Sequence, residues 1–122
     1  NHPEQYGIAP SLMGDQSHLT LAMEKLTKRR DLTYEMLNSV EGISCVKPEG
    51  AFYAFPKIEI EGSDNHFVAE LIKETGVVVV PGTGFGQVPG TNHFRVVFLP
   101  QEEILEKAYK SITEFYVKYR NR

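Results

Sequence analysis

The chain has no tryptophan, a single cysteine and no excess of positive charge. One cysteine excludes an internal disulfide bond, and the setting of Cys45 between Ile43 and Val46 is typical of a small buried apolar residue rather than of a nucleophile. The formal net charge is −3. Surfaces that bind nucleic acid are usually basic, so this charge argues against a nucleic-acid-binding protein.

Long apolar runs and paired histidines are also absent. No stretch approaches the ~20 apolar residues that a membrane-spanning helix needs, and no signal-peptide pattern begins at Asn1. The four histidines are scattered, and none of their spacings is that of a pair of metal ligands. We therefore predict a soluble, cytoplasmic protein without a metal site and without a membrane partner.

The 122 residues are enough for one domain built from helices and strands. Residues 1–15 are rich in glycine, proline and polar groups, and they predict an irregular arm. Apolar residues recur at helical spacing over residues 17–40, over residues 65–75, and from Pro100 to about Tyr119. Asp64 or Ser63 is a candidate N-cap of the second of these helices, and Gly76 is expected to end it. Short strands are expected in "ISCVKP", "AFYAFP", "VVVV" and "HFRVVFL". Because the strands come in pairs, residues 16–122 predict an α+β unit with a small, mainly antiparallel sheet and helices on one face.

The glycine-rich segment "PGTGFGQVPGT" raises the question of phosphate binding. A dinucleotide fingerprint places its glycines between a strand and the N-terminus of a helix, whose amides bind the phosphates. Here the segment leads into a strand, and no Lys-Ser or Lys-Thr pair follows. A loop with several positive φ angles, lying close to another part of the molecule, is the better interpretation.

The stretch "GAFYAF" loosely resembles the aromatic strand of an RNA-recognition fold, in which exposed rings stack on bases. Alternation along a strand puts Phe52 with Ala54 on one face and Tyr53 with Phe55 on the other. The competing interpretation is that these rings form core and cross-strand contacts, and the acidic net charge favours it. An α+β module that binds RNA or a small ligand without catalysis is therefore the alternative function.

Arg95 is a charged residue inside the apolar strand "HFRVVFL". Its neighbours Phe94 and Val96 share the face that predicts the core, and Arg95 lies on the opposite face. A buried arginine needs an anionic partner, which Glu49 or Glu102 could supply through the fold. An external carboxylate is the other possible partner, because the planar guanidinium binds it through two hydrogen bonds. The spacing alone does not decide between the two.

Four segments together favour an external carboxylate as the partner of Arg95. The segments are "RRDLTYEMLNSV", "KPEGAFYAFP", "FVAELIKETGVVVVPGTGFG" and "HFRVVFL". In series they resemble the C-terminal part of class I and II pyridoxal-5′-phosphate-dependent aminotransferases, over nearly the whole chain. The resemblance implies the small domain of a fold-type-I enzyme, with the first long helix leading out of a large domain. It further implies that Arg95 holds the substrate α-carboxylate, that Phe52 lies at the active-site wall, and that the glycine-rich loop lies near the cleft.

The family's cofactor-binding residues belong to the large domain. Nothing marks Lys47, Lys57 or Lys73 as the lysine that forms a Schiff base with pyridoxal phosphate. We therefore expect this chain to be a domain of a longer enzyme, to bind no cofactor by itself and to be inactive alone. The resemblance implies that the parent is a homodimeric transaminase, which transfers an amino group between an amino acid and a 2-oxo acid. It leaves open whether aspartate, alanine or an aromatic amino acid is preferred.

Overall fold

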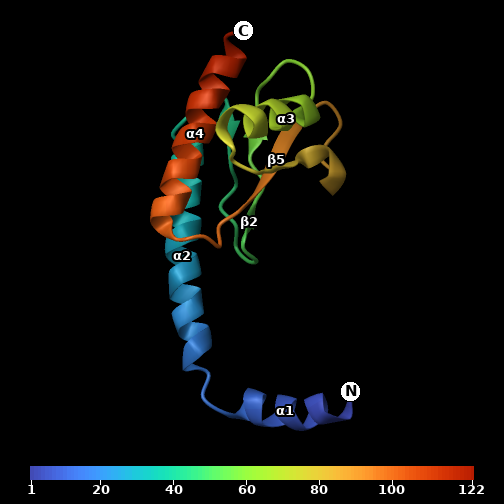
Figure 1. Cartoon of the computed structure of the whole chain (residues 1–122), viewed down its shortest axis with the longest axis vertical. Coiled ribbons are helices and arrows are strands. Elements are labelled where there is room, and N and C mark those ends of the chain that lie inside the picture. Colours follow the sequence, from blue (N-terminus) through green and yellow to red (C-terminus); the bar gives the residue numbers. More distant parts are fainter.

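The computed structural model describes all 122 residues and consists of four α-helices, five short strands and one 3₁₀ turn (Figure 1). In chain order these are α1 (His2–Met13), α2 (Ser17–Asn38), β1 (Ile43–Ser44), β2 (Tyr53–Ala54), β3 (Lys57–Ile58), α3 (Asp64–Thr75), β4 (Val80–Pro81), η1 (Gly82–Phe85), β5 (Asn92–Val97) and α4 (Glu102–Arg120). The expected α+β arrangement is confirmed.

Strand β5 is the centre of the sheet, and every strand pair is antiparallel. The strand order is β1-β3-β5-β2, and β4 also pairs with β5. Two registers decide which side chains share the outer face. Tyr53 of β2 lies opposite Val97, and Val80 of β4 lies opposite Arg95.

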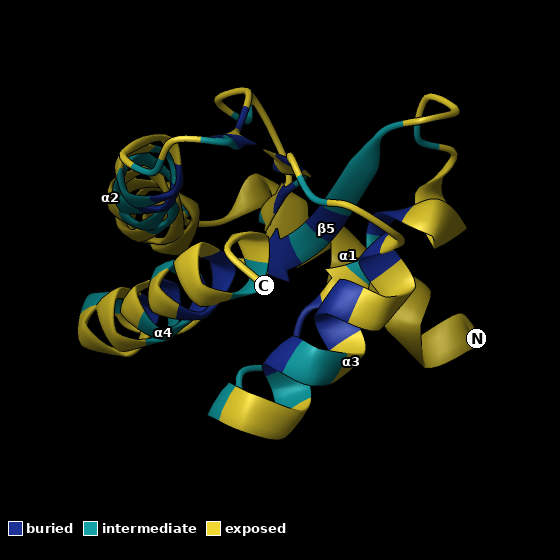
Figure 2. Ribbon diagram, turned by 90° about the horizontal axis from the view of Figure 1, so that it is seen from above, coloured by how far each residue is buried: buried dark blue, intermediate teal, exposed yellow.

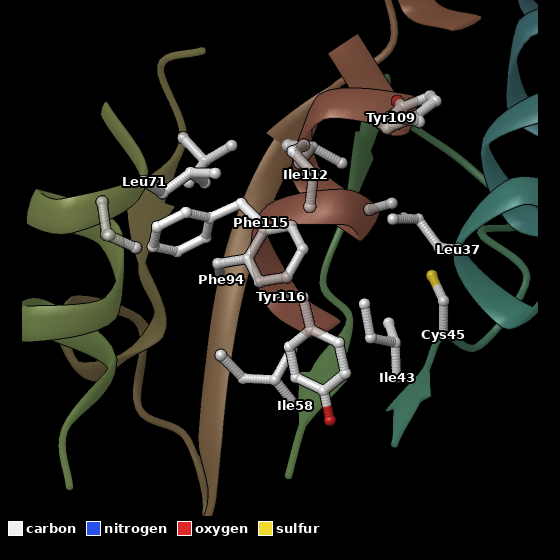
Figure 3. Packing of buried hydrophobic residues seen from close by; sticks show 14 of the residues in the cluster. Leu37, Ile43, Cys45, Ile58, Leu71, Phe94, Tyr109, Ile112, Phe115 and Tyr116 are labelled. Carbon is white, nitrogen blue, oxygen red and sulfur yellow. The ribbon is translucent and has the colours of Figure 1, made fainter. Parts of the chain in front are cut away.

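The core lies between the sheet and helices α2, α3 and α4, which gather on one side of β5 (Figure 2). Alternation along β5 sends Phe94 and Val96 inward, where they are 0% and 5% exposed. They meet apolar side chains from α3 and α4, including Leu71, Ile112 and Phe115 (Figure 3). The face of β5 that the sequence assigned to the core is therefore confirmed, and the opposite face, with Arg95, lies outside this core.

Helix α3 begins and ends where the sequence signals place it. The Ser63 hydroxyl accepts a hydrogen bond from the His66 backbone amide, so Ser63 is the N-cap. Gly76 ends the helix with a left-handed φ of 72°, a conformation that glycine adopts without the steric penalty of a Cβ. This placement fixes Asp64 as the first residue inside the helix.

Helix α2 packs only part of its length against the domain. Its buried residues, Thr33 and Leu37, belong to the C-terminal half, which lies beside α4. The N-terminal half continues away from the sheet and leads to α1 (Figure 1). None of the helices is both long enough and apolar enough to cross a membrane.

The irregular arm expected over residues 1–15 is wrong, because α1 occupies most of it. Pro3 lies in the first turn, where a backbone N–H has no partner within the helix. Pro10 lies inside the helix, where it cannot donate a hydrogen bond to the Tyr6 carbonyl and its ring crowds that group. The segment forms a helix in spite of Gly7 and Pro10, and the helix buries no residue.

The "VVVV" segment is not a buried strand over its whole length. Only Val80 lies in β4, and Val78 is 75% exposed, whereas Val79 is buried. Strand β4 pairs only with β5 and covers two residues. Val79 is buried in the core, and Val77 is partly buried against it. The run has no alternation of apolar and polar residues because the exposed positions, Val78 and Val80, are apolar as well.

Candidate functional site

Arg95 extends from the outer face of β5 and lies between two aromatic rings. The guanidinium carbon is 4.7 Å from the centroid of the Tyr53 ring and 4.1 Å from that of the Phe85 ring. Both distances are within the range of cation–π attraction, which holds a guanidinium by its faces. The N–H donors lie in the plane of the group, so stacking does not consume them.

The acidic residues considered as partners do not pair with Arg95. Glu102 instead lies 3.5 Å from Nε of Arg29, and Glu49 is exposed. None of the chain's ion pairs includes Arg95. Its Nε is buried and has no hydrogen-bond partner. Because an unpaired buried donor is costly, this arrangement favours a site that is completed by an anion from outside the chain.

Strand β2 supplies one of the two rings, and the residue it supplies is Tyr53 rather than Phe52. The Tyr53–Val97 register puts Tyr53 on the Arg95 face, where it is 38% exposed. Phe52 is partly buried against the core, with its ring 4.5 Å from that of Tyr53. The structure thus brings Tyr53 to Arg95 and leaves Phe52 on the other side of the strand, and a role for Phe52 at the substrate stays a prediction.

The second ring comes from the glycine-rich segment, which forms η1 and folds over the outer face of the sheet. Gly82 begins this turn and lies tightly against β5, because a Cβ there would be 2.6 Å from Cβ of His93. Phe85 ends the turn and is 44% exposed. The sequence predicted a loop that lies close to another part of the molecule. The structure shows that it packs on β5 and carries an aromatic ring to Arg95.

His93 and Phe55 continue the same face away from Arg95. Their rings stack 4.8 Å apart, and Phe55 also meets the edge of the Phe85 ring. Burial, with a smaller contribution from the charge of Lys57, lowers the pKa of His93 below its usual range. The imidazole is therefore neutral at neutral pH and leaves Arg95 as the cation between the rings.

An apolar groove adjoins Arg95 on the β4 side. Its volume is about 340 Å³, and most of its lining is aliphatic. Val78 and Val80 line it together with Val97, and α4 closes the other side. Arg95 is the only charged residue among those that line the groove, and a charged group beside an apolar surface suits a small organic acid with an aliphatic part.

The three lysines considered in the sequence, Lys47, Lys57 and Lys73, are all exposed. Lys47 is exposed and lies 3.0 Å from Asp31, and Lys73 is exposed on α3 near Glu70. Lys57 is exposed on β3. A lysine that forms a Schiff base with the cofactor needs an enclosed, desolvated setting, which none of these three has. No group of histidine, cysteine and acidic residues could hold a metal ion.

The two rings around Arg95 were not predicted, and the sequence contains a partial signal for only one of them, Tyr53. Alternation already separated Tyr53 from Phe52, but only the β2–β5 register shows which face meets Arg95. Phe85 lies in a loop, where no periodicity applies.

Comparison with known proteins identifies the same family over most of the chain. The family model described as aminotransferase class I and II matches residues 4–112. A probable mitochondrial alanine aminotransferase of Dictyostelium discoideum is 38% identical over 94% of this chain. The alanine aminotransferase of Mycobacterium tuberculosis is 38% identical over 98% of this chain. The matches span 25% and 29% of those two proteins, so the chain spans little more than a quarter of the length of these curated relatives.

Solved structures share the fold as well as the sequence. An alanine aminotransferase from Pyrococcus furiosus superposes with a TM-score of 0.88 and 43% identity, over 97% of this chain and 30% of that one. An aspartate aminotransferase from Rhizobium meliloti gives a TM-score of 0.78 and 33% identity, over 88% of this chain and 29% of that one.

Proposed function

Because this chain belongs to the aminotransferase class I and II family, we propose that it is the small domain that binds the substrate carboxylate in a pyridoxal-phosphate-dependent transaminase. The reaction of the whole enzyme transfers an amino group between an amino acid and a 2-oxo acid. The chain supplies Arg95 as the carboxylate-binding group. Other parts of the enzyme hold the cofactor.

One observation carries this proposal, namely the state of the Arg95 guanidinium. It is held by two ring faces and has no carboxylate of its own chain. Arg95 also lines an apolar groove, which suits a ligand with a carboxylate at one end and a short aliphatic part. Both substrates of a transamination, the amino acid and the 2-oxo acid, have this chemistry.

Within the reaction, this chain binds the substrate and orients it. Pyridoxal phosphate, held elsewhere in the enzyme, acts as the electron sink for the bonds that change at the substrate carbon. Arg95 binds the carboxylate through two parallel hydrogen bonds and thereby limits the rotation of the substrate about its Cα–carboxylate axis. The Tyr53 and Phe85 rings hold the guanidinium and reduce access of water to its faces.

The test compares Arg95→Ala and Arg95→Lys in the complete enzyme that carries this chain, with Arg30→Ala as a control. Arg30 is an arginine of α2 that pairs with Asp31. Arg95→Ala should weaken binding of both the amino acid and the 2-oxo acid by roughly 2–5 kcal/mol. Arg95→Lys restores the charge but not the two-pronged geometry, so it should recover only part of the loss. Alanine is the first amino acid to test, chosen from the names of the relatives, and a panel of 2-oxo acids serves as the amino-group acceptor.

A KM for both substrates that stays near the wild-type value in Arg95→Ala would refute the assignment. The alternative module is tested separately on the 122-residue chain. Binding of single-stranded RNA with a steep dependence on salt would support it and count against a role confined to transamination.

Three further parts of the proposal are carried by family membership alone. They are a contact between Phe52 and substrate in the whole enzyme, a homodimeric parent, and the absence of activity and cofactor binding in this chain by itself. An absorbance spectrum of the chain with added pyridoxal phosphate tests the last of these, because a stable aldimine band would contradict it. A cytoplasmic location stays a prediction.

A further inference from the structure

The carboxylate of Asp64 is buried and is not used by the proposed function. Asp64 is 1% exposed, although it begins a surface helix. It is not the cap of that helix, since the Ser63 hydroxyl already accepts the His66 amide. Removing a carboxylate from water is costly unless hydrogen bonds replace its hydration. The hydrogen-bond partners of Asp64 therefore indicate its role.

The partners of Asp64 lie in the glycine-rich turn. The backbone N–H of Thr83 donates to Oδ2 of Asp64 at 2.8 Å, and the Thr83 hydroxyl donates to Oδ1. Asn65 adds a longer hydrogen bond of 3.3 Å to Oδ1. Both oxygens of the carboxylate therefore bind the same residue of η1, and this double attachment fixes the turn to the N-terminal end of α3.

The attached turn is the one that reaches Arg95. Thr83 is the second residue of η1 and Phe85 is the last, with its ring 4.1 Å from the Arg95 guanidinium carbon. Gly82 holds the start of the turn against β5, and Asp64 holds the next residue. With these two points fixed, the short turn can place Phe85 in only a small range of positions.

Arg95 depends on that ring for its position. Its Nε has no hydrogen-bond partner in the chain, and no ion pair holds its guanidinium. An arginine side chain has several rotatable bonds, so loss of one of the two ring faces would let the guanidinium sample other rotamers. Asp64 forms no ion pair with Arg95 and acts on it through the turn.

We infer that Asp64 is a positioning residue for the carboxylate-binding arginine: it clamps Thr83, the clamped turn fixes Phe85, and Phe85 holds the Arg95 guanidinium in place. The inference rests on the proposed function for its catalytic consequence. Its geometric part concerns this chain alone and can be measured without substrate.

The geometric part is tested by NMR on the 122-residue chain. Stacking between two rings should shift the Arg95 Nε–H resonance away from that of a free arginine. Asp64→Ala should move this resonance most of the way back to the free value, and Asp64→Asn should move it less, because its amide oxygen can still accept the Thr83 N–H. Asp31→Asn removes an exposed carboxylate of α2 and serves as the control. An unchanged Arg95 resonance in folded Asp64→Ala would overturn the inference.

The catalytic part is tested in the complete enzyme. Asp64→Ala should raise KM for the amino acid and the 2-oxo acid about tenfold, with kcat changing less, and Asp64→Asn should lie between it and the wild type. In an Arg95→Lys background the same substitution should add less than twofold, because the group it positions is already altered. A fully additive effect would show that Asp64 does not act through Arg95. A lowered melting temperature with unchanged KM would show a structural role only.

A second variant keeps the test decisive if Asp64→Ala does not fold. Thr83→Val removes the hydroxyl hydrogen bond and keeps the backbone one, and Thr83 is exposed enough to tolerate the change. It should shift the Arg95 resonance and raise KM in the same direction, by a smaller amount. If Arg95→Ala leaves KM unchanged, the proposed function fails. If Arg95 matters and the Asp64 and Thr83 variants do not, only this inference fails.

Discussion

Oγ1 of Thr33 and Oη of Tyr109 lie 2.9 Å apart, inside the contact between α2 and α4. Both residues are at most 1% exposed. The Thr33 hydroxyl also donates to the Arg29 carbonyl at 2.7 Å, so the Tyr109 hydroxyl is left to donate to Thr33. The two partners are therefore not equivalent, because Thr33 has a second partner and Tyr109 does not.

The first prediction follows from this asymmetry. Thr33→Val leaves the Tyr109 hydroxyl buried without a partner and should lower the free energy of unfolding by about 2–3 kcal/mol. Tyr109→Phe leaves Thr33 bonded to Arg29 and should cost only about 1 kcal/mol. Urea unfolding of the two variants measures the difference. Equal losses, or a larger loss in Tyr109→Phe, would contradict the assigned hydrogen-bond directions.

The second prediction concerns alkaline pH. Burial raises the pKa of Tyr109 to about 12, which outweighs the opposing effect of the hydrogen bond to Thr33. The unfolded chain ionises this tyrosine near pH ~10. The folded state therefore binds more protons in the interval between these values, and stability should fall as the pH rises through it. In Tyr109→Phe the free energy of unfolding should decline less over this interval. Urea unfolding at about pH 9, 10 and 11 measures the difference.

The third prediction concerns Gly42. Its φ is +88°, and a Cβ at this position would collide with the Tyr116 hydroxyl and lie 2.8 Å from Nη1 of Arg120. The Tyr116 hydroxyl donates to the Glu59 carbonyl at 3.0 Å, so it cannot move without losing that bond. Gly42→Ala should therefore lower the free energy of unfolding by about 1–3 kcal/mol.

Gly50 provides the matched control for this substitution. Its surroundings are open and its φ is not positive, so Gly50→Ala should leave the unfolding midpoint nearly unchanged. A Gly42→Ala variant as stable as Gly50→Ala would show that the turn after α2 adapts to the added methyl group.

The fourth prediction concerns acid pH and Asp64. Burial alone would raise the pKa of this carboxyl, but the hydrogen bonds from Thr83 and its neighbours outweigh burial and hold the pKa below its usual range. The ionised carboxylate therefore contributes stability above the unfolded pKa of ~3.9, and this contribution is lost as the pH falls through the folded pKa. The stability difference between wild type and Asp64→Asn should thus be largest near neutral pH and shrink below pH ~4. A difference that grows on acidification would show that Asp64 is not stabilised as an anion.

The sequence predicted much of the fold because several signals agreed at the same residues. Alternation of apolar residues placed Phe94 and Val96 in the core and Arg95 outside it, and both are confirmed. Ser63 and Gly76 marked the two ends of α3 through their capping chemistry. These signals act over a few residues, so they can be evaluated without knowledge of the tertiary contacts.

The surroundings of Arg95 could not be predicted, because they depend on contacts between distant residues. Tyr53 reaches Arg95 only through the register of β2 on β5, and Phe85 only through the path of a glycine-rich turn. Asp64 was expected only as a possible helix cap, since sequence spacing does not show that its carboxylate binds Thr83. The rule that disfavours proline in helices led to the wrong expectation for residues 1–15, where α1 tolerates Pro10.

Helix α2 connects α1 to the rest of the domain as a stiff rod. With 22 residues, it is about 33 Å long, and only its C-terminal half is anchored in the domain. A stiff rod fixed at one end amplifies a small angular change at the other. Tilting the free half, which is about 16 Å long, by about 10° would displace the start of α2 and the attached end of α1 by roughly 3 Å. A change in the angle between α2 and α4 would therefore be expressed mainly at α1, the part of the chain that packs on nothing else.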